Sequence, residues 1–545
     1  MSTVRLVPLF GFVYNASIKT KTGLCMYTPY NNKKRSKVNI KLPLIFILLS
    51  ICSSSISATF NVNNNADTGD STPGDGICET STNNNICTLR AAIDETNSLT
   101  GPDTIFLPAD VYKIQTSAAN DNSSGSFYIS DGLTLNGENV STTVISGESL
   151  DRVFYINSPD HVRITDITIE KGNSGFSGSG GGILFSNTSL TSVIFNCVIR
   201  NNNAQTGAGV SWGSPVTAVT IENSVIENNT GISNAVPAYS AGAGIYSGTG
   251  LLSLSKSTVR NNTSVFGGGI FSIGDIEITR STISGNTATN QTSNNAQAGG
   301  GIHVGSGSAA TLISTNSTIS GNMSYGSGAG ILAANGTVSL YNTTITNNIA
   351  DFDNDGTGEA GGIDSSNMFD TQSVQLSNSI VAGNISNTGV YSDCKSRNFN
   401  ISSIGYNIIG DNTDCNISTH VSDLAGTTLT NLIDPLLLTL ANNGGLTQTH
   451  KLKQNSPAID AGNPANCLGH DGSILLLDQT GSNRHMDGFL LTQRCDIGAF
   501  ELEVSLNITA EGSIVIEDNS SSGAFNPLLS IFIFLTLLTI RGKRV

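Results

Sequence analysis

A glycine-rich element that ends in an aliphatic residue recurs along this chain, and its spacing constrains the fold more than any other feature. Each copy reads Gly or Ala twice, then Gly, then Ile or Val. The copies end at Ile183, Val210, Ile245, Ile270, Ile302, Ile331 and Ile363. Their mean spacing of about 30 residues is typical of repeat proteins, in which each unit packs on its neighbours. The 545 residues therefore predict one elongated stack rather than three or four separate domains.

A second element follows each glycine element, and it ends in asparagine. Residues 223–228 (Asn-Ser-Val-Ile-Glu-Asn) and 316–322 (Asn-Ser-Thr-Ile-Ser-Gly-Asn) are two copies. A segment of alternating apolar and polar residues usually lies between the two elements, as at 276–278 and 338–340. Each period therefore carries about three short strands with a two-residue alternation.

Strands this short cannot form stable hairpins alone, and no regular Asn-Gly or Asp-Gly turns connect them. Stacking each strand on its equivalent one period later gives parallel sheets, rungs about 4.8 Å apart and one continuous core. We therefore predict an all-β fold, a single-stranded right-handed parallel β-helix of about nine to eleven rungs. The recurrent asparagine predicts a ladder of stacked amides inside a turn. A β-propeller is the alternative, but it needs the missing hairpin turns.

The amino-terminal segment has the order of a secretory signal. A basic run at 33–41 precedes the apolar stretch 42–51 and the small residues 53–58. We assign residues 1–58 to this signal, with Met26 as an alternative start.

The carboxyl end carries a second targeting pattern. Fourteen mostly apolar residues, 527–540, precede a basic end, and a membrane-spanning helix needs about 20. Residues 523–545 are therefore predicted to be a bacterial sorting signal that an envelope sorting protease reads, with 504–522 as a linker. A lipid-anchor signal of the GPI type is the alternative.

The cysteines agree with export. Short loops between local pairs make disulfides the expected state in an oxidising compartment. We predict Cys78–Cys87, Cys394–Cys415 and Cys467–Cys495. Cys197 is left over, inside an apolar alternation, and is predicted to be a small buried side chain. The formal net charge of −15 argues against nucleic acid as a partner and against anionic membrane surfaces.

Both ends of the repeat resemble modules of bacterial surface β-helix proteins. Residues 87–92 (Cys-Thr-Leu-Arg-Ala-Ala) resemble the Cys-Ser-Leu-Arg-Glu-Ala module. Leu89, Ala92, Ile93 and Thr96 share one face of a short helix there. This helix would cap the first rung.

At the other end, residues 434–445, 456–462 and 495–501 resemble the choice-of-anchor module, and Asp478, Gly481 and Arg484 fit its Asp-x-x-Gly-x-x-Arg step. This family has the pectin-lyase-like fold. The repeats are also similar to those of chlamydial polymorphic outer-membrane proteins. The resemblance implies an N-terminal cap with the first rungs at 59–149, repeats at 150–425 and a C-terminal module at 426–503.

One acidic cluster is a candidate metal site. Asp351, Asp353 and Asp355, followed by glycine, copy the start of a calcium loop. The usual twelfth-position glutamate is missing, so Glu359 or Asp364 would replace it. The predicted ligand set is Asp351, Asp353, Asp355 and Glu359 with Ca²⁺, and a solvated acidic loop is the alternative.

The remaining charges give little sign of catalysis. Arg200, Arg260 and Arg280 occupy comparable places in their repeats. A solvated surface is the favoured interpretation of them, and one shared functional face is the alternative. The Gly-His-Gly and Asn-Thr-Asp signatures of pectin-degrading hydrolases are absent from the sequence. We therefore expect a non-catalytic adhesin or envelope interaction module at the cell surface (outer membrane) or outside the cell. Its partner would be a polysaccharide or a host or cell-surface ligand. A calcium-dependent polysaccharide lyase of the pectate-lyase type, or a glycoside hydrolase, is the alternative.

Overall fold

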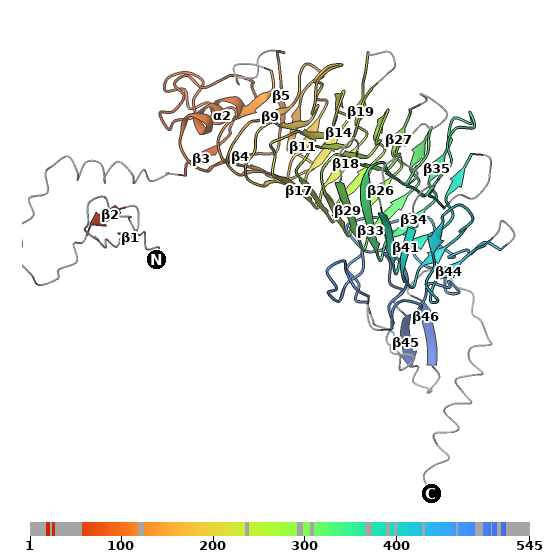
Figure 1. Ribbon diagram of the computed structural model, residues 1–545. Coiled ribbons are helices and arrows are strands. Elements are labelled where there is room, and N and C mark those ends of the chain that lie inside the picture. Colours follow the sequence, from red (N-terminus) through yellow and green to blue (C-terminus); the bar gives the residue numbers. More distant parts are fainter. Residues whose placement is uncertain are drawn as a thin grey trace, which may run out of the picture.

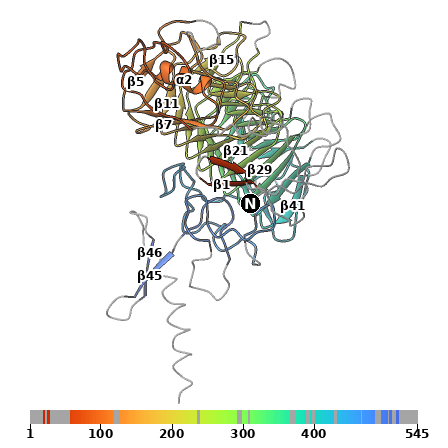
Figure 2. The same cartoon turned by 90° about the vertical axis from the view of Figure 1, so that its left-hand side faces the viewer.

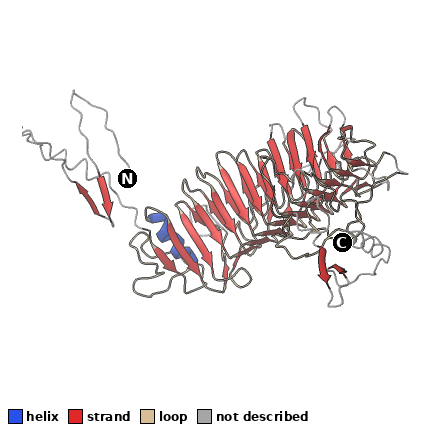
Figure 3. Ribbon diagram, turned by 90° about the horizontal axis from the view of Figure 1, so that it is seen from below, coloured by secondary structure: helices blue, strands red, loops and turns tan. Residues whose placement is uncertain are grey.

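Four parallel sheets run along the molecule, and the chain winds through them coil after coil (Figures 1 and 3). One coil consists of β13 (Ser192–Phe195), β14 (Val198–Arg200), β15 (Asn203–Ala204) and β16 (Val210–Trp212). The chain then enters the next coil at β17 (Ala218–Glu222), which pairs in parallel with β13. We name the four sheets I to IV in the order in which one coil visits them.

The computed structural model describes residues 57–502 apart from short gaps, together with four strands outside that range. The gaps are 118–124, 235–238, 291–297, 306–309, 366–372, 388–392, 397–400, 428–430, 465–466 and 485–493. The outlying strands are β1 (Ile18–Lys21), β2 (Leu24–Tyr27), β45 (Val504–Ile508) and β46 (Ile514–Asp518). The rest of the predicted signal and sorting segments lies outside the described residues. No helix among the described residues is long and apolar enough to cross a membrane.

The strands of the four sheets have the following bounds. Sheet I contains β3 (Thr59–Asn61), β4 (Asp103–Leu107), β7 (Leu133–Gly137), β10 (Val162–Thr165), β13, β17, β21 (Leu251–Ser255), β25 (Ile276–Thr279), β29 (Ala310–Thr315), β33 (Gly336–Tyr341), β37 (Ser373–Ser377), β41 (Ile401–Gly405) and β43 (Ile417–Ser418). Sheet II contains β5 (Val111–Lys113), β8 (Val144–Ser146), β11 (Thr168–Glu170), β14, β18 (Val225–Glu227), β22 (Thr258–Arg260), β26 (Thr282–Ser284), β30 (Thr318–Ser320), β34 (Thr344–Thr346), β38 (Ile380–Val381), β42 (Ile408–Ile409) and β44 (Leu424–Ala425). Sheet III contains β15, β19 (Thr230–Gly231), β23 (Thr263–Ser264), β27 (Thr287–Ala288), β31 (Met323–Ser324), β35 (Ile349–Ala350) and β39 (Ile385–Ser386). Sheet IV contains β6 (Phe127–Ile129), β9 (Phe154–Ile156), β12 (Ile183–Phe185), β16, β20 (Ile245–Ser247), β24 (Ile270–Ser272), β28 (Ile302–Val304), β32 (Ile331–Ala333), β36 (Ile363–Asp364) and β40 (Cys394–Lys395).

This architecture confirms the predicted right-handed parallel β-helix, with three differences in detail. The described sheets I, II and IV have 13, 12 and 10 strands, where nine to eleven rungs were predicted, because strands outside the repeat, such as β3 and β43, extend the stacks. Most central coils also have a fourth strand, in sheet III. Within the predicted linker, β45 and β46 pair as an antiparallel hairpin, because Val504–Ile508 has the alternation of a strand.

The core is a set of stacked aliphatic rows. In sheet II one inward residue of each strand lies directly over its equivalent in the next coil. The row is Ile145, Ile169, Ile199, Ile226, Val259, Ile283, Ile319, Ile345, Val381 and Ile409, and each residue is fully buried. Burying such a side chain stabilises the fold by about 1.5–3 kcal/mol. The repeated aliphatic position in the sequence is therefore the core itself.

An asparagine ladder runs through the turn between sheets II and III. Its members, all fully buried, are Asn202, Asn229, Asn262, Asn286, Asn322, Asn348 and Asn384. Each Nδ2 donates to the Oδ1 of the next asparagine at 2.8–2.9 Å. The same Oδ1 also accepts from the backbone N–H of the preceding asparagine. This ladder confirms the prediction and satisfies polar groups that would otherwise be buried without partners.

Gly209 shows why glycine precedes the aliphatic residue in the repeat. A Cβ added there would lie 2.5 Å from the carbonyl oxygen of Gly244 and 3.1 Å from Nδ2 of Asn229. Any side chain would therefore collide with the next coil and with the asparagine ladder.

A second inward ladder explains Cys197. Small residues stack at this position, and the backbone N–H of each donates to the hydroxyl of the next. The N–H of Cys197 donates to Oγ of Ser224, and the N–H of Ser224 donates to Oγ of Ser257. Cys197 is buried and unbonded to any described cysteine, as predicted. Burial raises the pKa of its thiol to about 12, so the thiol is unreactive at neutral pH.

A single described helix, α2 (Leu89–Ser98), lies at the amino-terminal end of the coils (Figures 1 and 2). Thr88 caps it, because its side chain accepts from the backbone N–H of Ala91. Arg90 is buried and pairs with Asp67 at 2.6 Å. The helix packs beside β4 and β6 and confirms the predicted cap, which protects the first strand edges from pairing with other chains.

The three predicted cysteine pairs are disulfide-bonded. The Cα–Cα distances are 5.1 Å for Cys78–Cys87, 4.8 Å for Cys394–Cys415 and 6.1 Å for Cys467–Cys495. Each bond closes a short loop at or beyond an end of the repeat.

The asparagine ladder ends on a buried carboxylate. Asp393 Oδ1 accepts from both the backbone N–H and Nδ2 of Asn384 at 2.8 Å, and its Oδ2 accepts from the backbone N–H of Asp411. All seven amides point their N–H groups toward this end, so their dipoles favour a negative charge there. Burial nevertheless dominates, and with the nearby Asp411 it raises the pKa of Asp393 from 3.8 to about 7.

We therefore predict that Asp393 makes stability fall as pH rises from about 4 to about 7. In this window the unfolded chain has released the proton while the folded chain still holds it, so each step up in pH favours unfolding. Asp393→Asn keeps an acceptor for the ladder and removes the titration. Urea unfolding of both proteins across this range should show a pH slope in the wild type that the variant lacks, with the exposed Asp160→Asn as control. Parallel pH profiles would contradict the assignment.

Candidate functional site

The acidic loop follows β35 at the turn from sheet III to sheet IV. Asp351 is 1% exposed, and its Oδ1 accepts from the backbone N–H groups of Asp355 and Gly356, both at 3.0 Å. These bonds fold the loop so that carboxylate oxygens of Asp351, Asp353 and Asp355 lie within 4.8 Å of one another. Three carboxylate ligands at this separation suit Ca²⁺, which prefers oxygen. This is the one such group among the described residues.

The structure places the fourth predicted ligand elsewhere. The carboxylate of Glu359 pairs with Nζ of Lys395 at 2.8 Å, and its backbone N–H donates to Oγ of Ser327. Asp364, the other candidate, lies in β36, in register with Lys395 of β40. The loop therefore brings together three of the four predicted ligands, and Glu359 would have to exchange Lys395 for the metal.

We predict that the loop binds Ca²⁺ weakly, because three carboxylates without a fourth protein carboxylate leave much of the coordination to water. Isothermal titration with Ca²⁺ should show one site that Asp351→Asn/Asp355→Asn abolishes and Asp160→Asn preserves. Equal Ca²⁺ binding by both variants would exclude the loop as the site, and no binding to the wild-type protein would leave it a solvated acidic turn.

The outer face of sheet II is paired electrostatically in its first coils. Arg200 contacts Glu170 at 2.9 Å, and Arg260 contacts Glu227 at 2.7 Å. The aligned outward residues of four consecutive coils are Glu170, Arg200, Glu227 and Arg260. Each charged side chain therefore has a neighbour of opposite charge. Arg280 does not share this face, so the alternative of one face lined by all three arginines is excluded. Its position in the repeat is that of Lys256, at the corner before the strand, and its Nε donates to the carbonyl of Gln479.

Further along, the same face is covered by the C-terminal module, which we define as residues 434–502. Thr282 Oγ1 donates to the carbonyl of Gln448 at 2.6 Å, and the hydroxyl of Ser320 contacts Nε2 of His450 at 2.8 Å. A small buried apolar cluster lies between the coils and the C-terminal module. It consists of Ile380, Ala382 and Ile408 from the coils and Leu452, Ala458, Ile497, Phe500 and Leu502 from the module.

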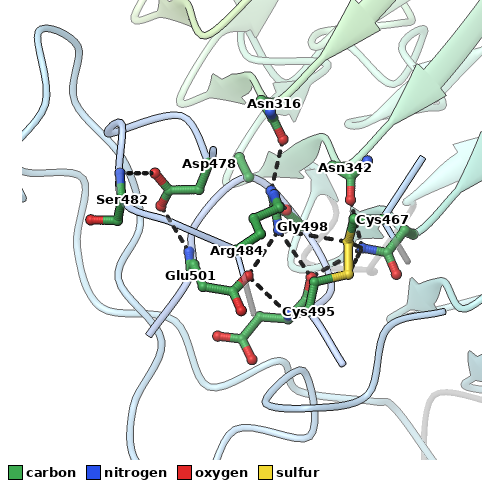
Figure 4. A network of polar contacts seen from close by, with 12 residues as sticks. Asn316, Asn342, Cys467, Asp478, Ser482, Arg484, Cys495, Gly498 and Glu501 are labelled. Carbon is green, nitrogen blue, oxygen red and sulfur yellow. Dashed lines mark hydrogen bonds and ion pairs between the residues drawn. A yellow bond between two sulfur atoms is a disulfide. The ribbon is translucent and has the colours of Figure 1, made fainter. Parts of the chain in front are cut away.

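A buried polar network holds this module together (Figure 4). Arg484 is fully enclosed, and it binds Glu501 at 3.1 Å, the carbonyl of Gly498 at 2.7 Å and Oδ1 of Asn316 in the coil at 2.8 Å. Asp478 Oδ1 accepts from the backbone N–H of Gly481 at 2.9 Å, and Oδ2 accepts from that of Glu501. The Asp-x-x-Gly-x-x-Arg step therefore orders the backbone of the module through Asp478. It also bonds the module to the β-helix through Arg484 and Asn316.

We predict that Arg484→Ala destabilises the module by about 3–5 kcal/mol, because it leaves Glu501 buried without its counter-charge. Limited proteolysis should release the module from the variant at denaturant concentrations that leave the wild type intact. Lys453→Ala, which removes an exposed cation of the same module, should change stability by less than about 0.5 kcal/mol. Identical proteolysis of the two variants would refute the role of Arg484.

Sequence reasoning missed a row of side chains on the outer face of sheet IV. Strand register aligns one outward residue from each of ten strands. The row reads Tyr128, Tyr155, Leu184, Ser211, Tyr246, Phe271, His303, Leu332, Asp364 and Lys395. The sequence signal for this row is the residue that directly follows the glycine element in each repeat.

Two solved structures are similar to parts of this chain. No family model and no curated protein matches the chain. The crystal structure of pectate lyase Pel9A is similar over 82% of this chain and 97% of its own, with 16% identity and a TM-score of 0.46. The A-module of the Azotobacter vinelandii mannuronan C-5 epimerase AlgE4 is similar over 68% of this chain and 98% of its own, with 14% identity and a TM-score of 0.38. By its sheets, the chain is a right-handed parallel β-helix.

Proposed function

We propose that this protein is exported and acts as a non-catalytic adhesin or envelope interaction module at the cell surface or outside the cell. The observation that carries the proposal is the pairing of four basic side chains on the described coils. Arg200, Lys256, Arg260 and Lys395 each form an ion pair with a glutamate. A polysaccharide lyase needs a base positioned to take a proton, and these four groups are engaged elsewhere.

The proposal extends to how the protein reaches its place. The disulfides fit an oxidising compartment. The signal pattern at 1–58 and the tail at 523–545 would direct export and processing by an envelope sorting protease. The cap around α2 and the C-terminal module would belong to the Cys-Ser-Leu-Arg-Glu-Ala and choice-of-anchor types. The partner would be a polysaccharide or a host or cell-surface ligand.

A calcium-dependent polysaccharide lyase or a glycoside hydrolase is the second candidate, and the acidic loop favours it. Asp351, Asp353 and Asp355 could hold Ca²⁺, and the Glu359–Lys395 pair would supply the nearest base if Glu359 moved to the metal. The fold alone does not establish an enzymatic activity, so an assay for sugar products must distinguish the two candidates.

We predict no release of unsaturated or reducing sugars when the full-length protein is incubated with polygalacturonate or alginate, with or without Ca²⁺, because Arg200, Lys256, Arg260 and Lys395 are engaged in ion pairs. Ultraviolet absorbance and a reducing-end assay would measure the two products. Calcium-dependent release that Asp351→Asn/Asp355→Asn abolishes, and Asp160→Asn does not, would overturn the non-catalytic proposal and establish the lyase.

A further inference from the structure

We propose that the outer face of sheet IV near its amino-terminal end binds an uncharged polysaccharide chain laid along the helix axis. The site is a tyrosine platform, which we define as Tyr128, Tyr155 and Leu184 with the flanking Asn157 and Ser186. The inference rests on the proposed interaction function and names both a surface and a ligand class for it.

The platform is built from consecutive coils. Tyr128, Tyr155 and Leu184 are in register on β6, β9 and β12, and each is partly exposed. The two tyrosine ring centroids lie 5.4 Å apart, with the ring planes inclined at 51°. Side chains on neighbouring coils stand about 4.8 Å apart, so the platform presents one ring or aliphatic group per coil along a straight line.

The rings are held in place by polar neighbours. Asn157 Nδ2 donates to the hydroxyl of Tyr128 at 3.0 Å, and the hydroxyl of Tyr155 donates to Oγ of Ser186 at 3.2 Å. The guanidinium of Arg152 lies 5.4 Å from the ring of Tyr155, and its Nε donates to the carbonyls of Ser179 and Gly180. A ligand therefore meets aromatic groups whose conformational entropy is already lost, which favours binding.

The other end of the row is closed to such a ligand. Phe271 and His303 are each 4% exposed, and their rings lie 4.5 Å apart. Burial lowers the pKa of His303 to about 4, so this imidazole is neutral at physiological pH. The row is therefore partly exposed at Tyr128, Tyr155 and Leu184, over two coil steps or about 10 Å, and again at Tyr246, beyond the buried Ser211.

The chemistry of this strip selects a sugar chain. Tyrosine offers an apolar ring and a polar tip. The C–H face of a pyranose can pack on the ring, while its hydroxyls bond the amide of Asn157 and the hydroxyls beside it. A peptide that added itself to a sheet edge would need unpaired backbone groups. Strands β9 and β12 pair on both sides, and α2 packs beside β6, the edge strand of sheet IV.

The negative charge of the protein favours an uncharged polysaccharide over an acidic one. The sequence has 26 basic and 41 acidic residues, and 11 of the basic residues lie in the first 58 and last five positions. The body therefore carries 15 basic residues against 41 acidic ones, a strongly negative balance that repels polyuronates at low ionic strength. Neutral polysaccharides carry no such penalty.

Affinity electrophoresis of the full-length protein tests the inference, with gels that contain mannan, xylan, β-glucan or polygalacturonate. At least one neutral polysaccharide should retard the wild type, polygalacturonate should not, and added salt should leave the retardation unchanged. Tyr128→Ala/Tyr155→Ala should weaken the association at least about tenfold, which corresponds to the loss of about 1.4 kcal/mol. Tyr325→Ala, which removes a partly exposed tyrosine from another part of the surface, should have no effect.

The fold of each variant can be followed independently. Trp212 is the one tryptophan of the chain and is fully buried, so unchanged emission shows an intact core. Tyr128→Phe/Tyr155→Phe keeps both rings and should keep at least half of the affinity. Retardation by no neutral polysaccharide, stronger retardation by polygalacturonate, or equal binding by the alanine and control variants would overturn the inference. These outcomes differ from release of sugar products, which would overturn the non-catalytic proposal instead.

Discussion

The structure depends on one interaction, the hydrogen bond from the side-chain amide of one coil to that of the next. Each asparagine of the ladder bonds the next asparagine and a backbone carbonyl of the preceding coil, as Asn229 does with Asn262 and Ile199. A buried amide without these partners would cost about 1–3 kcal/mol. Any slip of one coil against the next would break both bonds, so the ladder fixes the register of every strand that follows it.

The ladder fixes register without fixing length. Consecutive members are separated by as few as 24 residues, between Asn262 and Asn286, and by as many as 36, between Asn286 and Asn322. The extra residues leave the coil as surface loops, because the amide, the glycine before the aliphatic residue and the inward aliphatic residue all keep their places. Loop closure costs little more as a loop lengthens, so the interior tolerates variation that the surface can use.

The sequence was sufficient for this interior because its chemistry repeats. Asparagine, glycine and isoleucine recur in one order, and each has one physical reason to occupy its place. The contacts that could not be foreseen join residues far apart in the chain. Arg484 bonds Asn316, which lies 168 positions earlier in the chain, and the repeat spacing of the sequence gives no indication of that pair. Arg280 likewise bonds the carbonyl of Gln479, 199 positions away.

The candidate sites were only partly visible for the same reason. Three aspartates at alternate positions predict their own proximity, and the structure brings them together. The partner of Glu359 is Lys395, which lies one coil away and beyond a loop of irregular length. The aromatic row on sheet IV required the register of ten strands, because its members are separated by 25 to 32 residues in most steps.

The outer face of sheet II is neutralised by ion pairs in its first coils and covered by the C-terminal module in its later coils. A ligand-binding face would therefore lie on another sheet. Outward positions in a parallel sheet must be covered or made soluble. In its first coils sheet II has ion pairs such as Glu227–Arg260, and in its later coils the C-terminal module covers it. Neither solution leaves apolar rings exposed. Sheet IV keeps Tyr128 and Tyr155 partly exposed on β6 and β9, although buried or charged residues could occupy these positions in the same fold. Exposed aromatic side chains of this kind mark interaction surfaces, so the face that the module leaves bare is the one whose residues are suited to a partner.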